Sequence, residues 1–123
     1  MELVQVAQHA EDLDRAEAFY SALLGRAPSG RFDPPGLLFF ALGDTRLLLE
    51  AGAPSAMLYL RVDSVREAVE RLRAEGTAID SEPHVIFRHE NDALGPAGTD
   101  EWHASIHDSE GNLVGLVSQE KHA

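Results

Sequence analysis

Histidine is the most promising source of chemistry in this chain of 123 residues, because imidazole binds metals and exchanges protons near neutral pH. The chain has six histidines and no cysteine, which excludes thiolate metal sites, thiol nucleophiles and disulfides. The histidine spacing matches no short metal-binding motif. Two interpretations stay open: a metal site that combines His84 or His89 with His103 and Glu50, or polar side chains scattered over strands.

Aromatic side chains offer a second kind of chemistry, the binding of a small molecule. Alternation along the run MLYLR places Met57, Tyr59 and Arg61 on one face of a strand. The only tryptophan, Trp102, stands beside His103 at the start of another strand. Aromatic rings with a few polar groups are the usual lining of a ligand site. The alternative is that these rings, with Phe39 or Phe40, are core; by alternation, one of the two phenylalanines must be.

No other catalytic pattern stands out. There is no glycine-rich phosphate loop and no Ser–His–Asp arrangement. The acidic run Thr99–Glu101 next to Trp102 is interpreted as a solvated loop edge.

Composition limits the classes of partner. The net charge of −11 argues against nucleic acid, whose phosphates require Lys and Arg. It would suit a cationic ligand, but it also serves solubility alone. No long apolar run and no signal-peptide pattern is present, so we expect no membrane partner and a cytoplasmic protein.

Two similar stretches must position these side chains: Leu3–Gly25 and Met57–Gly76. Each begins as an alternating strand, passes an Asp/Ser turn, enters an amphipathic helix and stops at glycine. Aligning Gln5 with Met57 brings Asp12 onto Ser64, an offset of roughly fifty residues that is typical of a duplicated unit. Asp12 and Ser64 are good N-caps, so the spacing predicts helices around Leu13–Leu24 and Val65–Glu75.

The remaining chain reads mainly as strands. A short strand could lie within 26–33, and 52–55 is a linker between the repeats. The segment 90–98 is rich in Asn, Asp, Gly and Pro; it is either a lid over a ligand site or a mobile hairpin tip. Each half is therefore strand, helix and three strands. The predicted strands cover 3–8, 37–42, 45–51, 82–89, 101–107 and 113–118.

The duplicated unit, with the sequences DLDRAEAFYSALLG (Asp12–Gly25) and HDSEGNLVGLVS (His107–Ser118), resembles the vicinal oxygen chelate superfamily. That group includes glyoxalase I, bleomycin-resistance proteins, ring-cleaving dioxygenases and methylmalonyl epimerase. The resemblance covers residues 3–118 and implies an α+β fold of two βαβββ modules, with curled mixed sheets that form an open cup. It indicates fold more strongly than function, because such folds host several chemistries.

The resemblance also implies four metal-ligand positions, usually two His and two Glu. Here they correspond to Gln5, Glu50, Met57 and Gly115. A Met thioether prefers soft metals and glycine offers no side chain, so the usual site is degenerate. The resemblance gives Glu50 a catalytic role as general base, although Arg46 and Arg61 on its predicted face favour an ion pair instead.

These observations lead to one leading expectation: a single domain over 1–123, with repeats at about 2–51 and 56–119, that binds a small molecule without metal or cofactor. The alternative is a metal-dependent lyase, isomerase or dioxygenase with a rearranged His/Glu site for Zn, Ni, Fe or Mn; a regulatory module without ligand stays open. We expect a homodimer, as the resemblance implies. The predicted ligand-binding residues are Gln5, Arg46, Met57, Tyr59, Arg61, His84, Trp102 and His103.

Overall fold

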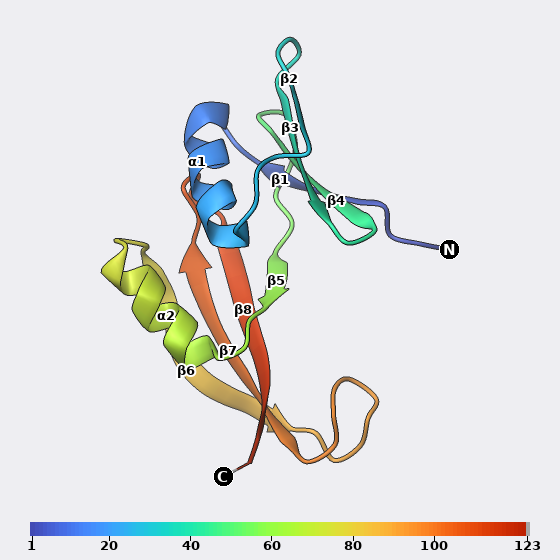
Figure 1. Cartoon of the computed structure of the whole chain (residues 1–123), viewed down its shortest axis with the longest axis vertical. Helices are drawn as coiled ribbons and strands as arrows, with labels where there is room; N and C mark the ends of the chain where they lie inside the picture. Colours follow the sequence, from blue (N-terminus) through green and yellow to red (C-terminus); the bar gives the residue numbers. More distant parts are fainter. Residues whose placement is uncertain (123) are drawn as a thin grey trace. The chain divides into compact units, whose positions relative to one another are not determined.

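Each predicted repeat folds into one helix packed on a four-stranded mixed sheet (Figure 1). The computed structural model describes residues 1–122 and divides into two units. The first unit comprises Met1–Ala56 and Ser109–Asn112, and the second comprises Met57–Asp108 and the chain from Leu113 onward.

The first unit has the sheet order β1-β4-β3-β2. Strand β1 runs parallel to β4, and the other neighbours are antiparallel. Its elements are β1 (Gln5–His9), α1 (Leu13–Leu24), β2 (Gly30–Phe32), β3 (Leu37–Leu42) and β4 (Thr45–Glu50).

The second unit repeats this plan with the order β5-β8-β7-β6, and β5 runs parallel to β8. Both sheets are open, and the predicted pair of βαβββ modules is confirmed. Its elements are β5 (Leu58–Arg61), α2 (Val65–Ala74), β6 (Ile79–Arg88), β7 (Thr99–His107) and β8 (Leu113–Lys121).

Local sequence explains where helix α1 begins and ends. The Asp12 carboxylate accepts a hydrogen bond from the Arg15 amide at 3.0 Å, and Gly25 ends the helix with a φ of 66°. The buried face of α1 carries Tyr20, whose ring centroid lies 6.2 Å from that of Phe40 on β3. Phe40 is therefore the core member of the phenylalanine pair, as alternation predicts.

Helix α2 follows the same rules. The Ser64 hydroxyl accepts from the Glu67 amide at 3.3 Å, and Ser118 of β8 accepts from the Val65 amide at 3.1 Å. The buried face of α2 holds residues at three- and four-residue spacing, as predicted: Val65, Ala68, Val69 and Leu72.

The start of α1 also receives a carboxylate from the turn at 109–112. Glu110 accepts from the amides of Glu11 and Asp12 at 2.9 and 3.0 Å and from the Arg15 guanidinium at 2.7 Å. Its side chain is buried. The bond from Arg15 outweighs the effect of burial and lowers the pKa of Glu110 to about 2.

Three strands of the second unit are longer than predicted. Strand β8 continues through the polar residues Gln119–Lys121, and β7 begins at Thr99, where the two strands pair. The interpretation of Thr99–Glu101 as a solvated loop is wrong, because cross-strand pairing extends the sheet through these polar residues. Strand β6 begins at Ile79 despite Pro83, which an edge strand with register shifts can accommodate.

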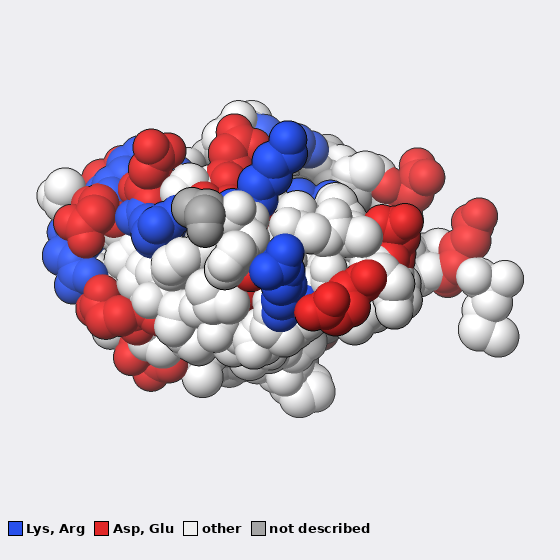
Figure 2. Space-filling model, turned by 90° about the horizontal axis from the view of Figure 1, so that it is seen from below, with Lys and Arg blue, Asp and Glu red and all other residues white. Residues whose placement is uncertain are grey.

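The surface carries both signs of charge. On the face in Figure 2, acidic and basic side chains are interspersed around uncharged surface. Within residues 1–122, no helix has the length and apolar character needed to cross a membrane.

Candidate functional site

The helix-free face of the first sheet contains an aromatic hollow. We use "aromatic hollow" for the concavity of about 410 Å³ lined by Ser29, Gly30, Phe32, Phe39 and Arg46. It arises because the β2–β3 hairpin places Gly30 opposite Phe39, with Phe32 on the same face two residues on. The two phenylalanine rings meet edge to face with centroids 6.0 Å apart.

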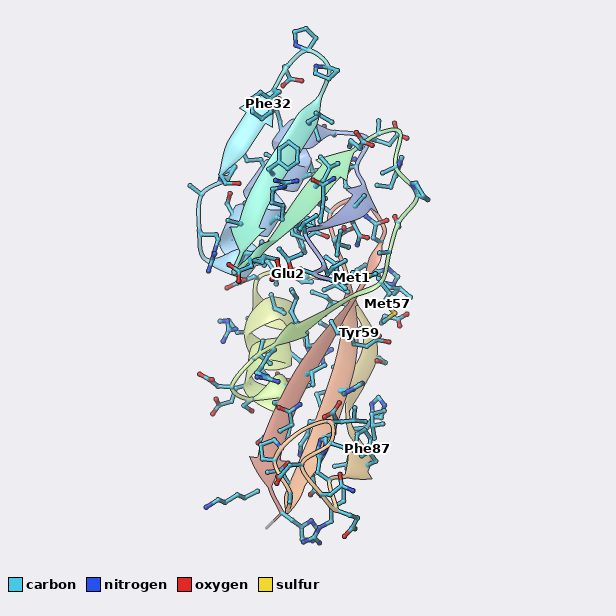
Figure 3. The ribbon with its side chains drawn as sticks, turned by 90° about the vertical axis from the view of Figure 1, so that its right-hand side faces the viewer. Met1, Glu2, Phe32, Met57, Tyr59 and Phe87 are labelled. Carbon is cyan, nitrogen blue, oxygen red and sulfur yellow. The ribbon has the colours of Figure 1, made fainter. Side chains whose placement is uncertain are left out.

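Glycine at position 30 makes room for one wall of the aromatic hollow. A Cβ there would lie 3.2 Å from a ring carbon of Phe32, so the ring lies close over the Gly30 backbone. Phe32 is nevertheless 54% exposed and extends from β2 in Figure 3. The aromatic hollow therefore offers an apolar ring surface to solvent.

Arg46 supplies the charge of the aromatic hollow. Its guanidinium lies 6.0 Å from the centroid of the Phe39 ring, and its Nε donates to the side-chain oxygen of Gln5 at 3.2 Å. Among the described residues 1–122, no carboxylate forms an ion pair with Arg46. Two predicted ligand residues, Gln5 and Arg46, are thus in contact.

Glu50 lies away from both. In the parallel pair of β1 and β4, Gln5 stands opposite Arg46, whereas Glu50 stands opposite His9. Four residues of strand separate the two pairs, about 13 Å. The register does not bring Gln5 and Glu50 together. The residue of β4 equivalent to Gly115 is Leu48, because Leu48 stands opposite Ala7 as Gly115 stands opposite Tyr59.

Glu50 instead lines a second cavity of about 540 Å³ at the start of α1. Five of its lining residues are acidic, and its one arginine, Arg31, is paired with Asp14 at 2.8 Å and Asp33 at 2.9 Å. The hydrogen bonds that Arg31 donates to Glu17, Asp33 and Asp14 raise its pKa. Within residues 1–122, Glu50 has no ion pair, so the expected pairing with Arg46 is absent from this unit.

In the second unit, Tyr59 covers the position where the resemblance places a metal ligand. A Cβ on Gly115 would lie 2.6 Å from the Tyr59 ring, so the ring rests against the glycine backbone. Tyr59 is 58% exposed, and its ring centroid lies 5.8 Å from that of His103. Met57 and Tyr59 lie at the start of β5 in Figure 3.

Glu101 organises the histidines of the helix-free face of the second sheet. One carboxylate oxygen contacts His89 Nε2 at 2.7 Å, and the other contacts His103 Nε2 at 2.8 Å. Gln119 donates to the first oxygen at 3.0 Å. Burial alone would raise the pKa of Glu101, but the hydrogen bonds from Gln119, His103 and His89 hold that pKa below its usual value.

The other predicted residues of this unit are divided between its two faces. His84 stands opposite His103 in the β6–β7 ladder, and its Nδ1 lies 2.8 Å from the carbonyl oxygen of Glu82. Arg61 is exposed on β5. Trp102 lies on the opposite face from His103, where the Arg66 guanidinium of α2 stacks 4.1 Å from its ring centroid. Adjacent strand residues point to opposite faces, so grouping Trp102 with His103 in one pocket is wrong.

The loop 90–98 is folded against His89. A Cβ on Gly95 would lie 2.8 Å from the His89 ring, so the loop backbone packs directly on a buried imidazole. The loop also forms internal bonds, from the Ala97 amide to Asp92 at 2.8 Å and from the Thr99 hydroxyl to the Pro96 carbonyl at 2.6 Å. A lid role stays a prediction.

The donor set does not fit the family's metal. Met57 offers only a thioether, the space beside Gly115 holds the Tyr59 ring, and Gln5 accepts from Arg46. Across residues 1–122, no three His, Asp or Glu side chains lie close enough together to hold one ion.

Two contributing residues were missed from sequence. Phe32 falls in a segment interpreted as irregular, although a Pro-Pro-Gly turn between it and Leu37 indicates a hairpin that would pair the two strands. Glu101 precedes His103 by two residues, a spacing that places both on one face of a strand. The available signal was therefore the turn for Phe32 and alternation for Glu101.

The fold and the two helix-free faces define a class: a duplicated βαβββ protein with open, partly aromatic sheet surfaces. The family model described as Glyoxalase/Bleomycin resistance protein/Dioxygenase superfamily matches residues 2–116. The chain belongs to this superfamily. No match was found among curated proteins.

Solved structures share the fold at low sequence identity. An antibiotic-binding protein, TnmS3 of Streptomyces sp. CB03234, is 21% identical with a TM-score of 0.73, covering 98% of this chain and 97% of that one. A lactoylglutathione lyase from Agrobacterium tumefaciens is 24% identical with a TM-score of 0.67, covering 95% and 92%. A glyoxalase I mutant from Zea mays is 18% identical with a TM-score of 0.70, covering 98% and 45%.

Proposed function

We propose that this chain is a small-molecule-binding protein of the glyoxalase/bleomycin resistance type that binds its ligand without the family metal. The observation that carries the proposal is the aromatic hollow, which combines exposed ring surface with one oriented arginine. Ligand sites of this kind pair apolar walls with a few polar groups that fix orientation. The antibiotic-binding relative with the same fold supports a binding role.

The experiment is a titration of isotopically labelled protein with naphthalene carboxylic acid derivatives, monitored by NMR. Binding in the aromatic hollow should shift the backbone amides of Gly30, Phe32 and Phe39 and leave α2 unchanged. A Phe32→Ala variant should weaken binding by roughly 2- to 10-fold, because an aromatic ring pair contributes about 0.5 to 1.5 kcal/mol. Shifts spread over both units, or none at millimolar probe, would contradict the proposal.

The competing proposal is a metal-dependent lyase, isomerase or dioxygenase with a rearranged site. Its support is that Glu101 brings His89 and His103 to one carboxylate, although both Nε2 atoms would have to exchange their bonds to Glu101 for bonds to a metal. Elemental analysis of protein purified without an affinity tag separates the two proposals. Stoichiometric zinc, nickel, iron or manganese would support the enzyme and refute metal-free binding.

We also propose that the chain forms a homodimer and acts in the cytoplasm, apart from nucleic acid and membranes. Support for the dimer comes from exposed apolar side chains of the second sheet, among them Tyr59 and Phe87. Sedimentation at micromolar concentration tests it: a monomer would contradict the proposal.

A further inference from the structure

We infer that the aromatic hollow selects planar aromatic anions, with Arg46 as the group that recognises the negative charge. This inference rests on the proposed binding function and names the chemical class of its ligand. It follows from three features of the first unit: an unpaired guanidinium, the way that guanidinium is held, and the shape of the ring surface beside it.

The first feature is the absence of an internal anion for Arg46. The chain has 21 acidic residues and 10 basic ones, so carboxylates are available in excess. Four of the nine arginines form ion pairs with them: Arg15, Arg31, Arg66 and Arg73. Within residues 1–122, Arg46 forms none, and its only side-chain hydrogen bond goes to the neutral amide of Gln5. Its charge is left for a ligand.

The second feature is orientation. The bond from Arg46 Nε to Gln5 fixes one edge of the guanidinium, and the Phe39 ring supports its face. The two terminal nitrogens keep their hydrogens for a partner. A planar guanidinium held in this way can donate two parallel hydrogen bonds to a carboxylate or a sulfonate. Little side-chain entropy remains to be lost on binding.

The third feature is the ring surface. Phe32 and Phe39 stand edge to face, so an inserted flat ring could stack on one and meet the edge of the other. The volume of about 410 Å³ lies within the usual range for a small-molecule site. Ser29 and Gly30 complete the lining without a charge. A ligand with a flat aromatic ring and one negative group can therefore contact both phenylalanine rings and Arg46.

The net charge of the chain makes the expected preference for anions a specific test of the local contacts. A net charge of −11 repels anions at long range, so any preference for an anion must come from local contacts. A cationic ligand would be attracted to the chain as a whole but would meet Arg46 in the aromatic hollow. The prediction is thus opposite to the one that net charge alone would make.

The test uses three probes of equal shape: naphthoate, naphthamide and naphthylmethylammonium. Affinity for the intact chain is measured by calorimetry at one ionic strength, with NMR to locate binding. We expect naphthoate to bind about 10- to 100-fold more tightly than naphthamide, because a charged hydrogen bond contributes roughly 1.5 to 3 kcal/mol. Naphthylmethylammonium should bind the aromatic hollow most weakly.

Variants identify the responsible group. Arg46→Gln should remove the preference, so that the ratio of naphthoate affinity to naphthamide affinity falls to about one. The matched control is Arg61→Gln, an exposed arginine on the second sheet that changes net charge equally; it should preserve the preference. Arg46→Lys should retain part of it, since the charge remains while the planar fork is lost.

The outcomes separate the two proposals. If naphthoate and naphthamide bind the aromatic hollow equally, or if the ammonium probe binds best, anion selection is overturned and the binding function stands. If Arg61→Gln rather than Arg46→Gln removes the preference, the assignment to Arg46 is overturned. If none of the probes shifts the amides of the aromatic hollow, the proposed function itself fails at this site.

Discussion

The two units share one topology, but in one cross-strand pair the larger side chain lies on opposite strands in the two units. In the first unit, small Ala7 of β1 stands opposite large Leu48 of β4. At the equivalent position of the second unit, large Tyr59 of β5 stands opposite Gly115 of β8. A cross-strand pair can exchange its large and small members while the volume between the strands is conserved. The two surfaces therefore differ: the first unit has the aliphatic side chain of Leu48 at this position, and the second has the Tyr59 ring over the Gly115 backbone.

The polar groups differ in the same way. In the first unit, the Arg46 guanidinium bonds to the neutral amide of Gln5 and has no carboxylate partner within residues 1–122. In the second unit, the Glu101 carboxylate is bonded to two histidines and a glutamine. A satisfied network favours rigidity, and an unsatisfied charge favours a ligand. The comparison teaches that duplication preserved the scaffold and let the two faces diverge. Four substitutions test it, beginning with the largest expected effect.

Glu110→Gln should lower stability by about 2 kcal/mol near pH 7. The fall in the pKa of Glu110 from 4.5 to about 2 corresponds to about 3 kcal/mol, reduced because Arg15 is half-exposed. Because the folded pKa is depressed, this stability is fully present above pH 4.5 and is lost as pH falls from 4.5 toward 2. Urea unfolding at several pH values measures it.

The matched control for Glu110→Gln is Glu2→Gln, which removes the same charge from an exposed position. The difference in unfolding free energy between the two variants should shrink below pH 4.5. A difference that is constant with pH would show that the Arg15 ion pair does not stabilise the start of α1.

Gln8→Leu should raise stability by about 1 to 2 kcal/mol. The Gln8 amide is fully buried and has no hydrogen-bond partner within residues 1–122, and such groups are costly. The repeat places Leu60 at the equivalent position of the second unit, so the variant gives the first unit the second unit's residue. Thermal and urea unfolding report the gain. Gln119→Leu, which removes a partnered amide, should instead destabilise.

Gly95→Ala should cost about 1 kcal/mol, since its Cβ would lie 2.8 Å from the His89 ring and must push the loop away. Amide hydrogen exchange in 90–98 should become faster, with little change in the first unit. Gly52→Ala is the control, because a Cβ there meets no atom within 4 Å. Unchanged exchange in the loop would mean that Gly95 does not anchor it.

Gly115→Ala should have the smallest effect, less than about 1 kcal/mol, because the exposed Tyr59 ring can swing aside. The chain has two tyrosines, and Tyr20 is buried, so the NMR signals of Tyr59 are readily assigned. They should shift while those of Tyr20 stay fixed. If Tyr59 keeps its signals, its ring does not rest on Gly115 and the contrast with Ala7 and Leu48 is lost.

Local patterns predicted most of the fold. The helix bounds followed from three- and four-residue apolar spacing and from the capping residues Asp12, Ser64 and Gly25. The strand ends were harder, because Gln119–Lys121 and Thr99–Glu101 are polar. These two segments are strands because they pair with each other, and the pattern of either segment alone does not show that pairing.

The candidate site was predicted less well than the fold. Alternation correctly predicted that one of Phe39 and Phe40 is core, and the structure identifies it as Phe40. The same rule, applied to Trp102 and His103, would have separated them. Register was the missing information: that Gln5 stands opposite Arg46, and Glu50 opposite His9, depends on how two distant strands align. The contact between Gly115 and Tyr59 likewise depends on pairing.

The turn at 109–112 has a consequence for the order of synthesis. Glu110 bonds to residues 95 to 99 positions earlier in the chain, and Asn112 donates to the carbonyl of His9 across 103 positions. A chain made from its N-terminus must therefore present α1 and its sheet long before the partners of their exposed amides exist. Completion of the first unit waits until residues 109–112 have left the ribosome. Contacts of such long range also favour slow folding, so the nascent first half is a natural client for chaperones.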